Sequence, residues 1–442
     1  MKEEIEEYFL RRNCIAEDRV IDEIIRRGGL SYLIKNEKKI NFKKGIVSFE
    51  DLPVEKEFSI LKEFNIRGYP GISNTFESLF SSRLNNLRKI LRESGIPGFQ
   101  SSIQTARKLN GEVGIIGIVR EVNKIEGRII SITIEDETDS IKVYLGKNID
   151  DIILEDEVLG ITGKFNNKKD VFYANSIKRP EARKERTVLE KNSKVLVLSD
   201  IHVGSKKFLD NEFADMIDYV NSMGVSHVIM NGDLVDGIGI YPDQEKDLAI
   251  SDIVHQYKKL SELISKFNKN VRVILIPGNH DIVYSTEPQN PLPKDINDLF
   301  PQNVQSLSNP VWIEISGRVF LLYHGTSIMD FVEMFPGFSL NDSKKVMREM
   351  IKRRHLAPTF GRNLSFLPLR EDFYIMDPIP DVFITGHIHD HSTDNYNGIL
   401  TINASTFQDQ TDYQRMMNFN PRPGLGTVVN TSDLSVEVVK FS

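Results

Sequence analysis

The stretch Val271–Asp281 reads VRVILIPGNHD and changes character along its length. Its first six residues are mainly apolar and β-branched, which is typical of a buried strand. A Pro-Gly pair then lets the backbone turn sharply, and the chain presents Asn279, His280 and Asp281 in a row. An amide, an imidazole and a carboxylate placed directly after a core strand make this strand end a candidate functional site.

Four more apolar runs end in polar residues of the same kind. The runs are KVLVLSD, VSHVIMNGD, RVFLLYHG and DVFITGHIH, and the residues at or just beyond their ends are Asp200, His202, Asp233, His324, His387 and His389. Helical stretches alternate with these runs, which predicts an α/β domain with buried sheets. Ligands of open α/β sheets gather at the carboxyl ends of the strands, so five such ends can converge on one crevice.

Taken singly, each of these residues has an ordinary structural explanation. A Gly-Asp pair after a strand is a common turn, and a lone histidine is more often a core residue than a ligand. The set as a whole favours a site, because five of the nine histidines of the chain lie at these strand ends. His227, His255 and His355 fall outside the set and are interpreted as structural or exposed, whereas His391 stays undecided.

The residue types indicate which metal the site would hold. Carboxylate, imidazole and amide ligands without a thiolate suit Mn²⁺ first, with Fe²⁺, Zn²⁺ or Mg²⁺ as alternatives, and the single cysteine excludes a thiolate cluster. Seven candidate ligands exceed the roughly four to six that one ion takes, so we expect two ions. Two such ions, about 3.5 to 4 Å apart, clamp the attacking and leaving oxygens of a phosphoester displacement.

The predicted site also requires a particular backbone conformation at two of the strand ends. Alternate residues of an extended segment point to opposite sides, so Asp200 and His202 can share one centre only where the strand has given way to a loop. The same holds for His387 and His389. His280, beside the candidate ligand Asn279, is then free to contact the substrate.

The 442 residues are too many for one core, and two or three domains are expected. We expect a helical module over 1–35, a linker of uncertain order over 36–74, a helix and lead-in over 75–110, and the α/β domain over 190–442. Residues 111–180 contain five short strand patterns, which predict a barrel of the OB type. Such barrels often bind single-stranded nucleic acid, and the alternative is a barrel that serves only as a docking surface.

Composition and charge limit the possible partners. No run of about 18 apolar residues occurs, so we expect no membrane span. The charged start of the chain, MKEEIEEYFLRR, lacks the apolar stretch of a signal peptide, and we expect the chain to stay in the cytoplasm. With a net charge of -7, the protein must meet nucleic acid through a local basic patch or through a partner.

The order D-x-H, G-D, G-N-H-D, H and G-H-x-H, over about residues 194 to 440, resembles the calcineurin-like binuclear metallophosphoesterases. That resemblance implies an α/β sandwich of two mixed sheets flanked by helices. It also implies one ion held by Asp200, His202, Asp233 and His389, and a second held by Asp233, Asn279, His324 and His387. Asp233 would bridge the ions, His280 would face the scissile phosphate, and Asp236 would orient His280.

Two further stretches, YPDQEKDLAISDIVHQY and FQDQTDYQRMMNFNPRPG, resemble the small subunits of archaeal D-family DNA polymerases, over roughly residues 75 to 442. The resemblance implies a heterodimer with a large polymerase subunit, a location at the nucleoid, and contact with the sliding clamp through the complex. It implies a 3′ to 5′ proofreading exonuclease acting on single-stranded or mismatched DNA ends. Eukaryotic relatives have lost the metal ligands and act as scaffolds, whereas this sequence keeps all of them.

Two alternatives remain at this point. The chain could be a scaffold with a vestigial metal site, or a stand-alone phosphatase or repair nuclease of the same superfamily. The barrel ahead of the metal domain argues against a stand-alone enzyme.

Overall fold

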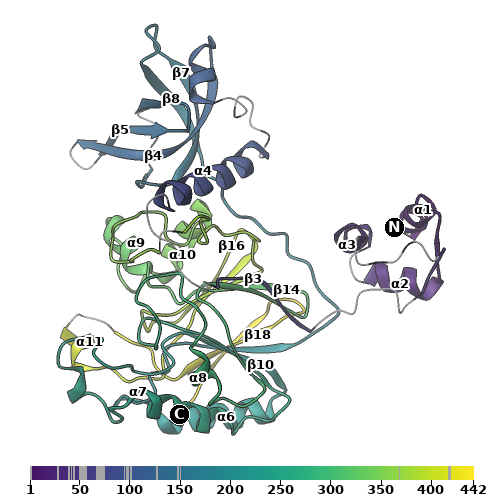
Figure 1. Cartoon of the computed structure of the whole chain (residues 1–442), viewed down its shortest axis with the longest axis vertical. Helices are drawn as coiled ribbons and strands as arrows, with labels where there is room; N and C mark the ends of the chain where they lie inside the picture. Colours follow the sequence, from purple (N-terminus) through teal and green to yellow (C-terminus); the bar gives the residue numbers. More distant parts are fainter. Residues whose placement is uncertain are drawn as a thin grey trace.

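The computed structural model describes residues 2–26, 29–37, 40, 42, 45–48, 57–65, 75–93, 95, 99, 102–125, 128–146, 149, 151–367, 369–416 and 420–442. Figure 1 shows a small N-terminal module, a β-barrel and a large two-sheet domain. Among the described helices, none is both long and apolar enough to cross a membrane.

The large domain contains two six-stranded sheets of mixed direction. The order of the first sheet is β12 (Val304–Ser306), β11 (Arg272–Ile276), β10 (Val225–Asn231), β9 (Lys194–Leu198), β18 (Leu425–Asn430) and β19 (Val436–Lys440). The order of the second sheet is β16 (Ser392–Tyr396), β17 (Ile399–Asn403), β15 (Val382–Thr385), β14 (Arg318–Leu322), β13 (Val311–Ile315) and β3 (Phe58–Glu63). The strands β9 to β12 are mutually parallel, as are β14, β15 and β17.

The alternation of apolar residues along the strands explains why the sheets stack. In β9, Val195 and Val197 face the core between the two sheets, whereas Leu196 and Leu198 face the helices on the outer side. A strand buried on both faces needs an apolar residue at every buried position, as Val195–Leu198 of this strand provide.

Helices cover both outer faces of the sandwich. The helices α6 (Asp210–Ser222) and α7 (Ile253–Ile264) pack on the first sheet, whereas α9 (Ile328–Met334) and α10 (Ser343–Arg353) pack on the second. Short helical segments lie in the connections, at η4 (Gln244–Lys246), α8 (Lys294–Asn297) and α11 (Asp412–Met416). The expected sandwich of two mixed sheets flanked by helices is confirmed.

Five strands close into the barrel in the order β4-β5-β6-β8-β7. Their bounds are β4 (Val113–Ile125), β5 (Arg128–Glu135), β6 (Ser140–Leu145), β7 (Val158–Phe165) and β8 (Val171–Lys178). The pair β6 and β8 is parallel and all other neighbours are antiparallel, which is the pairing of an OB barrel. The predicted barrel is therefore confirmed.

The helix α4 (Thr75–Glu93) lies between the barrel and the large domain (Figure 1). Its apolar face packs on β4 and β7. From the same helix, the buried Arg83 donates to Asp372 of the large domain at 2.6 Å. A second buried ion pair joins Glu157 of the barrel to Arg353 of α10 at 2.8 Å. The barrel is thus fixed to the helix layer of the second sheet. The short helix α5 (Ile103–Arg107) packs on β4 of the barrel.

The N-terminal module has its own small core. It contains α1 (Lys2–Leu10), β1 (Ile15–Ala16), α2 (Asp18–Arg26), α3 (Leu30–Asn36) and β2 (Ile46–Val47). Parallel pairing of β1 with β2 brings residues beyond position 35 into the module.

The interpretation of residues 36–74 as a linker differs from the structure at β2, described above, and at one further strand, whereas positions 49–56 and 66–74 lie outside the described residues. Phe58–Glu63 forms β3, which pairs antiparallel with β13 at the edge of the second sheet. Apolar and polar residues do not alternate along this strand, because the apolar Ile60 and Leu61 are adjacent. Both side chains are exposed, at 37% and 42%. An edge strand is paired on one side only and can lack the period-two pattern that identifies a half-buried strand.

His227, on β10, gives a pH-dependent contribution to stability. Burial lowers the pKa of His227 to about 4. Between pH 6.5 and pH 4 the unfolded chain therefore takes up a proton that the folded chain rejects, and stability is lost as the pH falls through this window. The loss between pH 7 and pH 5 is about 2 kcal/mol. We expect His227→Gln to reduce the fall in thermal midpoint between these two pH values.

The matched control is His255→Gln, because His255 is 65% exposed on α7. That variant should show the same fall as the wild type. If the thermal midpoint of His227→Gln fell as much as that of the wild type between pH 7 and pH 5, burial of this imidazole would not be the cause of the loss of stability in acid.

Candidate metal centre

The five predicted strand ends meet at one edge of the sandwich. The strands β9, β10 and β11 come from the first sheet, and β14 and β15 come from the second. Within the described chain, three groups of side chains have ligand atoms that lie within 4.8 Å of one another. The groups are Asp200, His202 and His389; Asp233, His324 and His387; and His202, Asp236 and His280. Asn279 joins the second group, because its Oδ1 lies 3.1 Å from His324 Nε2.

The backbone bends unusually where it presents these residues. Asp200, His202, Asp233, His387 and His389 have φ angles of 51°, 54°, 48°, 70° and 53°. Positive φ is uncommon outside glycine and is found at sites where the surrounding structure holds a strained conformation. These left-handed turns allow alternate residues, Asp200 with His202 and His387 with His389, to lie in one site.

Two glycines permit the close approach of the loops. A Cβ added at Gly278 would lie 2.2 Å from Asp233 Oδ1. One added at Gly386 would lie 2.0 Å from Ser199 Oγ and 2.5 Å from Asp200 Oδ2. The glycines that precede Asn279 and His387 are therefore required by packing around the carboxylates.

Asp233 lies between the two main groups. Its Oδ2 is 3.4 Å from His324 Nε2 and 3.8 Å from His202 Nε2. Its Oδ1 accepts a hydrogen bond from the backbone N–H of His280 at 2.9 Å. Burial would raise the pKa of Asp233, but the neighbouring His324 and His280 hold it well below its usual value. The carboxylate therefore stays charged and faces both groups at once.

The second group favours a cation. His324 Nδ1 donates to the carbonyl oxygen of Asn231 at 3.0 Å, so His324 Nε2 faces the oxygens of Asn279 and Asp233. A nitrogen lone pair directed at two oxygens is favourable only when a proton or a metal ion lies between them. Burial opposes that charge, yet the Asp233 carboxylate raises the pKa of His324 to about 10.

Two buried atoms at the site lack a hydrogen-bond partner among the residues that the structure describes. One is His387 Nδ1, and burial lowers the pKa of His387 to about 4, which keeps its ring neutral. The other is Asp200 Oδ1, which lies 3.3 Å from His389 Nε2. Neutral imidazoles and ionised carboxylates without partners are what a divalent ion binds, so the residues fit a metal site.

Asp236 differs from the expectation that its side chain orients His280. Its carboxylate instead pairs with His202 Nδ1 at 3.0 Å, an arrangement that orients metal-binding histidines. His280 Nδ1 donates to the backbone carbonyl of Asp236 at 2.7 Å. The carbonyl oxygen can only accept, so the His280 Nε2 atom is left to face the site.

Sequence reasoning missed two glutamines that surround the histidines. Gln408 Nε2 donates to Asp236 Oδ1 at 2.8 Å, and Gln414 Nε2 lies 3.0 Å from His389 Nδ1. Both belong to the stretch FQDQTDYQ, in which Gln408 precedes α11 and Gln414 lies within it. The sequence signal that could have indicated them is the presence of three glutamines within seven residues, shortly after a core strand.

Asp281, which had no expected role, connects two of the loops. Its buried carboxylate accepts hydrogen bonds from Gly278 N at 2.8 Å, Leu234 N at 3.1 Å and Tyr257 Oη at 2.7 Å. Burial and the nearby Asp233 raise the pKa of Asp281 to about 6. The loop after β10 is thereby fixed to the loop after β11.

The remaining histidines lie outside the centre. His355 Nε2 pairs with Asp372 at 2.9 Å beneath α4, and His391 Nε2 lies 2.9 Å from Thr427 Oγ1. His227 is buried on β10, and His255 is exposed. His355 and His227 therefore have the structural roles that the sequence indicated.

The two-sheet sandwich and its buried Asp and His clusters define a phosphoesterase-like protein. Residues 195–394 match the family model for the B subunits of DNA polymerases alpha and epsilon. A DNA polymerase II small subunit of Thermoplasma acidophilum is 37% identical over 98% of this chain and 92% of the relative. A DNA polymerase II small subunit of Archaeoglobus fulgidus is 38% identical over 79% of this chain and 73% of the relative. The chain belongs to the family of archaeal DNA polymerase II small subunits, which confirms the resemblance seen in its motifs.

A solved structure of an archaeal phosphodiesterase is 14% identical and covers 56% of this chain and 99% of its own length, with a TM-score of 0.28. At this similarity the assignment of the fold rests on the strand order of the present chain.

Proposed function

We propose that the chain is the 3′ to 5′ proofreading exonuclease subunit of an archaeal DNA polymerase. The observation that carries this proposal is the position of Asp233 between two groups of metal-capable side chains. Asp200, His202, Asp233 and His389 would hold one divalent ion, and Asp233, Asn279, His324 and His387 would hold the other. When bound, two such ions, of which Mn²⁺ suits this donor set, supply a nucleophilic water and neutralise charge on the phosphodiester.

His280 is the proposed general acid. Its ring is part of the mouth of the site, with 15% of the side chain exposed, and its Nδ1 is held by the Asp236 carbonyl. In its protonated form, His280 Nε2 would donate a proton to the 3′ oxygen that leaves when the terminal nucleotide is released. The backbone carbonyl therefore positions the ring, and the Asp236 carboxylate keeps His202 oriented.

The partners follow from the family. A small polymerase subunit acts with a large one, so we expect a heterodimer in which the polymerase presents single-stranded or mismatched 3′ ends to this site. Contact with the sliding clamp would be made through the complex. The net charge of -7 agrees with a chain that receives DNA partly from a partner.

A single-strand assay tests the proposal. The chain, purified with its large subunit and supplied with Mn²⁺, should shorten a 5′-labelled oligonucleotide stepwise, whereas a 3′-labelled strand should release labelled mononucleotide at once. A chelator should stop both reactions. A scaffold would leave both oligonucleotides intact, and a repair nuclease that cuts internally would produce fragments without this polarity.

A further inference from the structure

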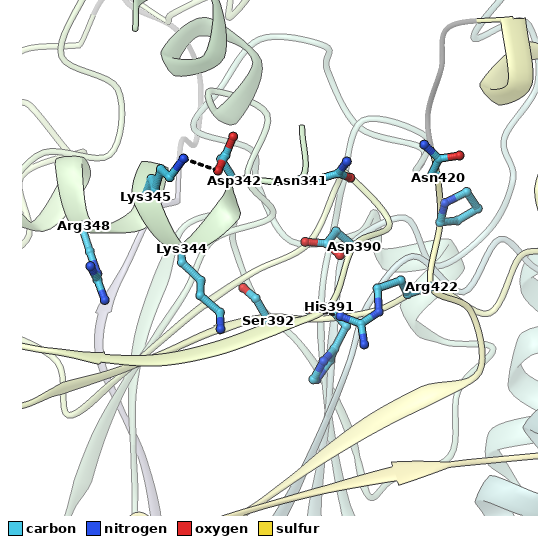
Figure 2. A pocket seen from close by; sticks show the side chains of 11 residues that line it. Asn341, Asp342, Lys344, Lys345, Arg348, Asp390, His391, Ser392, Asn420 and Arg422 are labelled. Carbon is cyan, nitrogen blue, oxygen red and sulfur yellow. Dashed lines mark hydrogen bonds and ion pairs between the residues drawn. The ribbon is translucent and has the colours of Figure 1, made fainter. Parts of the chain in front are cut away.

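A pocket of about 780 Å³ lies beside the metal centre. The walls come from the first turns of α10, the start of β16 and residues 420–422 (Figure 2). Its volume is within the range of roughly 300 to 1,000 Å³ that is typical of ligand sites. Ten of the eleven lining residues have polar or charged side chains, and the exception is Pro421.

One wall of the pocket is the loop that carries the ligand His389. Arg422 N donates to the carbonyl oxygen of His389 at 2.9 Å, and Arg422 Nη1 donates to the carbonyl oxygen of His391 at 3.0 Å. The side chain of His389 faces Asp200 and His202. The pocket and the metal centre therefore share one short loop.

The charge of the lining is positive. Four basic residues, Lys344, Lys345, Arg348 and Arg422, face two acidic ones, Asp342 and Asp390. Lys345 pairs with Asp342 at 2.6 Å, and Arg348 pairs with Asp394 at 2.7 Å.

Two of these cations are available to a ligand. In the described part of the chain, neither Lys344 nor Arg422 forms an ion pair with a carboxylate. Figure 2 shows their side chains on either side of Ser392. The buried Asp390 offsets part of this charge and accepts a hydrogen bond from Ser343 Oγ at 3.3 Å.

We propose that this pocket binds the phosphodiester backbone of the DNA strand, a nucleotide or two before the bond that is cut. The inference rests on the proposed exonuclease function. Lys344 and Arg422 would contact phosphate oxygens, and the Asn341 and Asn420 amides supply further hydrogen-bond donors. For a chain with a net charge of -7, the pocket supplies the local positive patch that DNA binding requires.

Binding of a single strand by the full chain tests this inference without any need for catalysis. The probe is a fluorescein-labelled oligothymidylate, followed by anisotropy in EDTA over a range of salt concentrations. We expect Lys344→Gln to weaken binding about three- to tenfold and to reduce the slope of log affinity against log salt by roughly 0.7. Lys344→Arg, which keeps the charge, should restore most of the affinity.

The matched control is Lys352→Gln, which removes the same charge from the far end of α10, where Lys352 pairs with Glu349 at 2.6 Å outside the pocket. Its affinity and salt slope should equal those of the wild type. The inference is overturned if Lys344→Gln binds like Lys352→Gln, or if the wild type shows no salt-dependent binding.

The same samples separate the inference from the function on which it rests. A strand that binds through Lys344 but is never shortened when Mn²⁺ is added would contradict the exonuclease and leave the binding site standing. If Lys344→Gln cleaved the strand and bound it as tightly as the wild type does, the binding site would be contradicted and the exonuclease would stand.

Discussion

Replacing Asp233 with alanine is expected to lower the exonuclease rate by on the order of 10⁴-fold, or about 5 kcal/mol of transition-state stabilisation. The physical reason is the position of the carboxylate, which faces His202 at 3.8 Å and His324 at 3.4 Å. Its removal would leave both groups of ligands without their shared anion. Single-turnover rates on a single-stranded oligonucleotide measure the loss.

The control for this variant is Asp215→Ala, because Asp215 is exposed on α6, which packs on the outer face of the first sheet. Its rate should match the wild type. Metal content should fall in the Asp233 variant alone. A rate equal to that of the wild type would favour the scaffold, in which the metal site has no role.

His280→Ala is expected to reduce the rate about 10³-fold while the metal content stays unchanged. Retention of metal is expected because His280 Nδ1 is committed to the Asp236 carbonyl and the ring is the proton donor, not a ligand. The comparison variant is His255→Ala, which removes an exposed imidazole from α7.

The leaving group distinguishes a general acid from a residue that only supports the fold. A p-nitrophenyl phosphodiester expels an anion that needs no proton, so His280→Ala should slow its hydrolysis far less than that of DNA. Equal losses on both substrates, or an unchanged rate on DNA with metal retained, would remove His280 from the assigned role.

Much of the site could be predicted because each residue marks the end of a recognisable strand. The runs that end in Asp200, Asp233, Asn279, His324 and His387 are apolar, short and followed by turn residues. Strand ends of this type converge by a general rule of α/β sheets, so the grouping follows once the strands are identified.

Other features depend on contacts between segments that are distant in the sequence. The strand β3 precedes the barrel in the sequence, whereas its partner β13 follows the barrel. Because β3 is an exposed edge strand, its sequence has no period-two pattern that would identify it. Which histidine Asp236 orients depends on the conformation of the turn after β10. There the Asp236 carboxylate pairs with His202, whereas its backbone carbonyl accepts a hydrogen bond from His280. The contact of Gln414 with His389 spans two sheet connections and cannot be found from spacing alone.

The stretch Val271–Asp281 shows both outcomes. Its strand and the positions of Asn279 and His280 were expected, and the structure places both at the mouth of the site. The role of Asp281 was not expected. Its three hydrogen bonds, to Gly278, Leu234 and Tyr257, make it the residue that fixes the loops around the ligands.

The most direct test of a two-metal exonuclease is metal stoichiometry measured together with activity. The complex, stripped of metal and titrated with Mn²⁺, is assayed at each step for bound metal and for release of the 3′ terminal nucleotide. We expect activity to rise with the second equivalent of metal per chain and to be absent from the Asp233→Ala complex. Full activity in the stripped complex, or activity that is equal in the Asp233→Ala complex, would contradict the account.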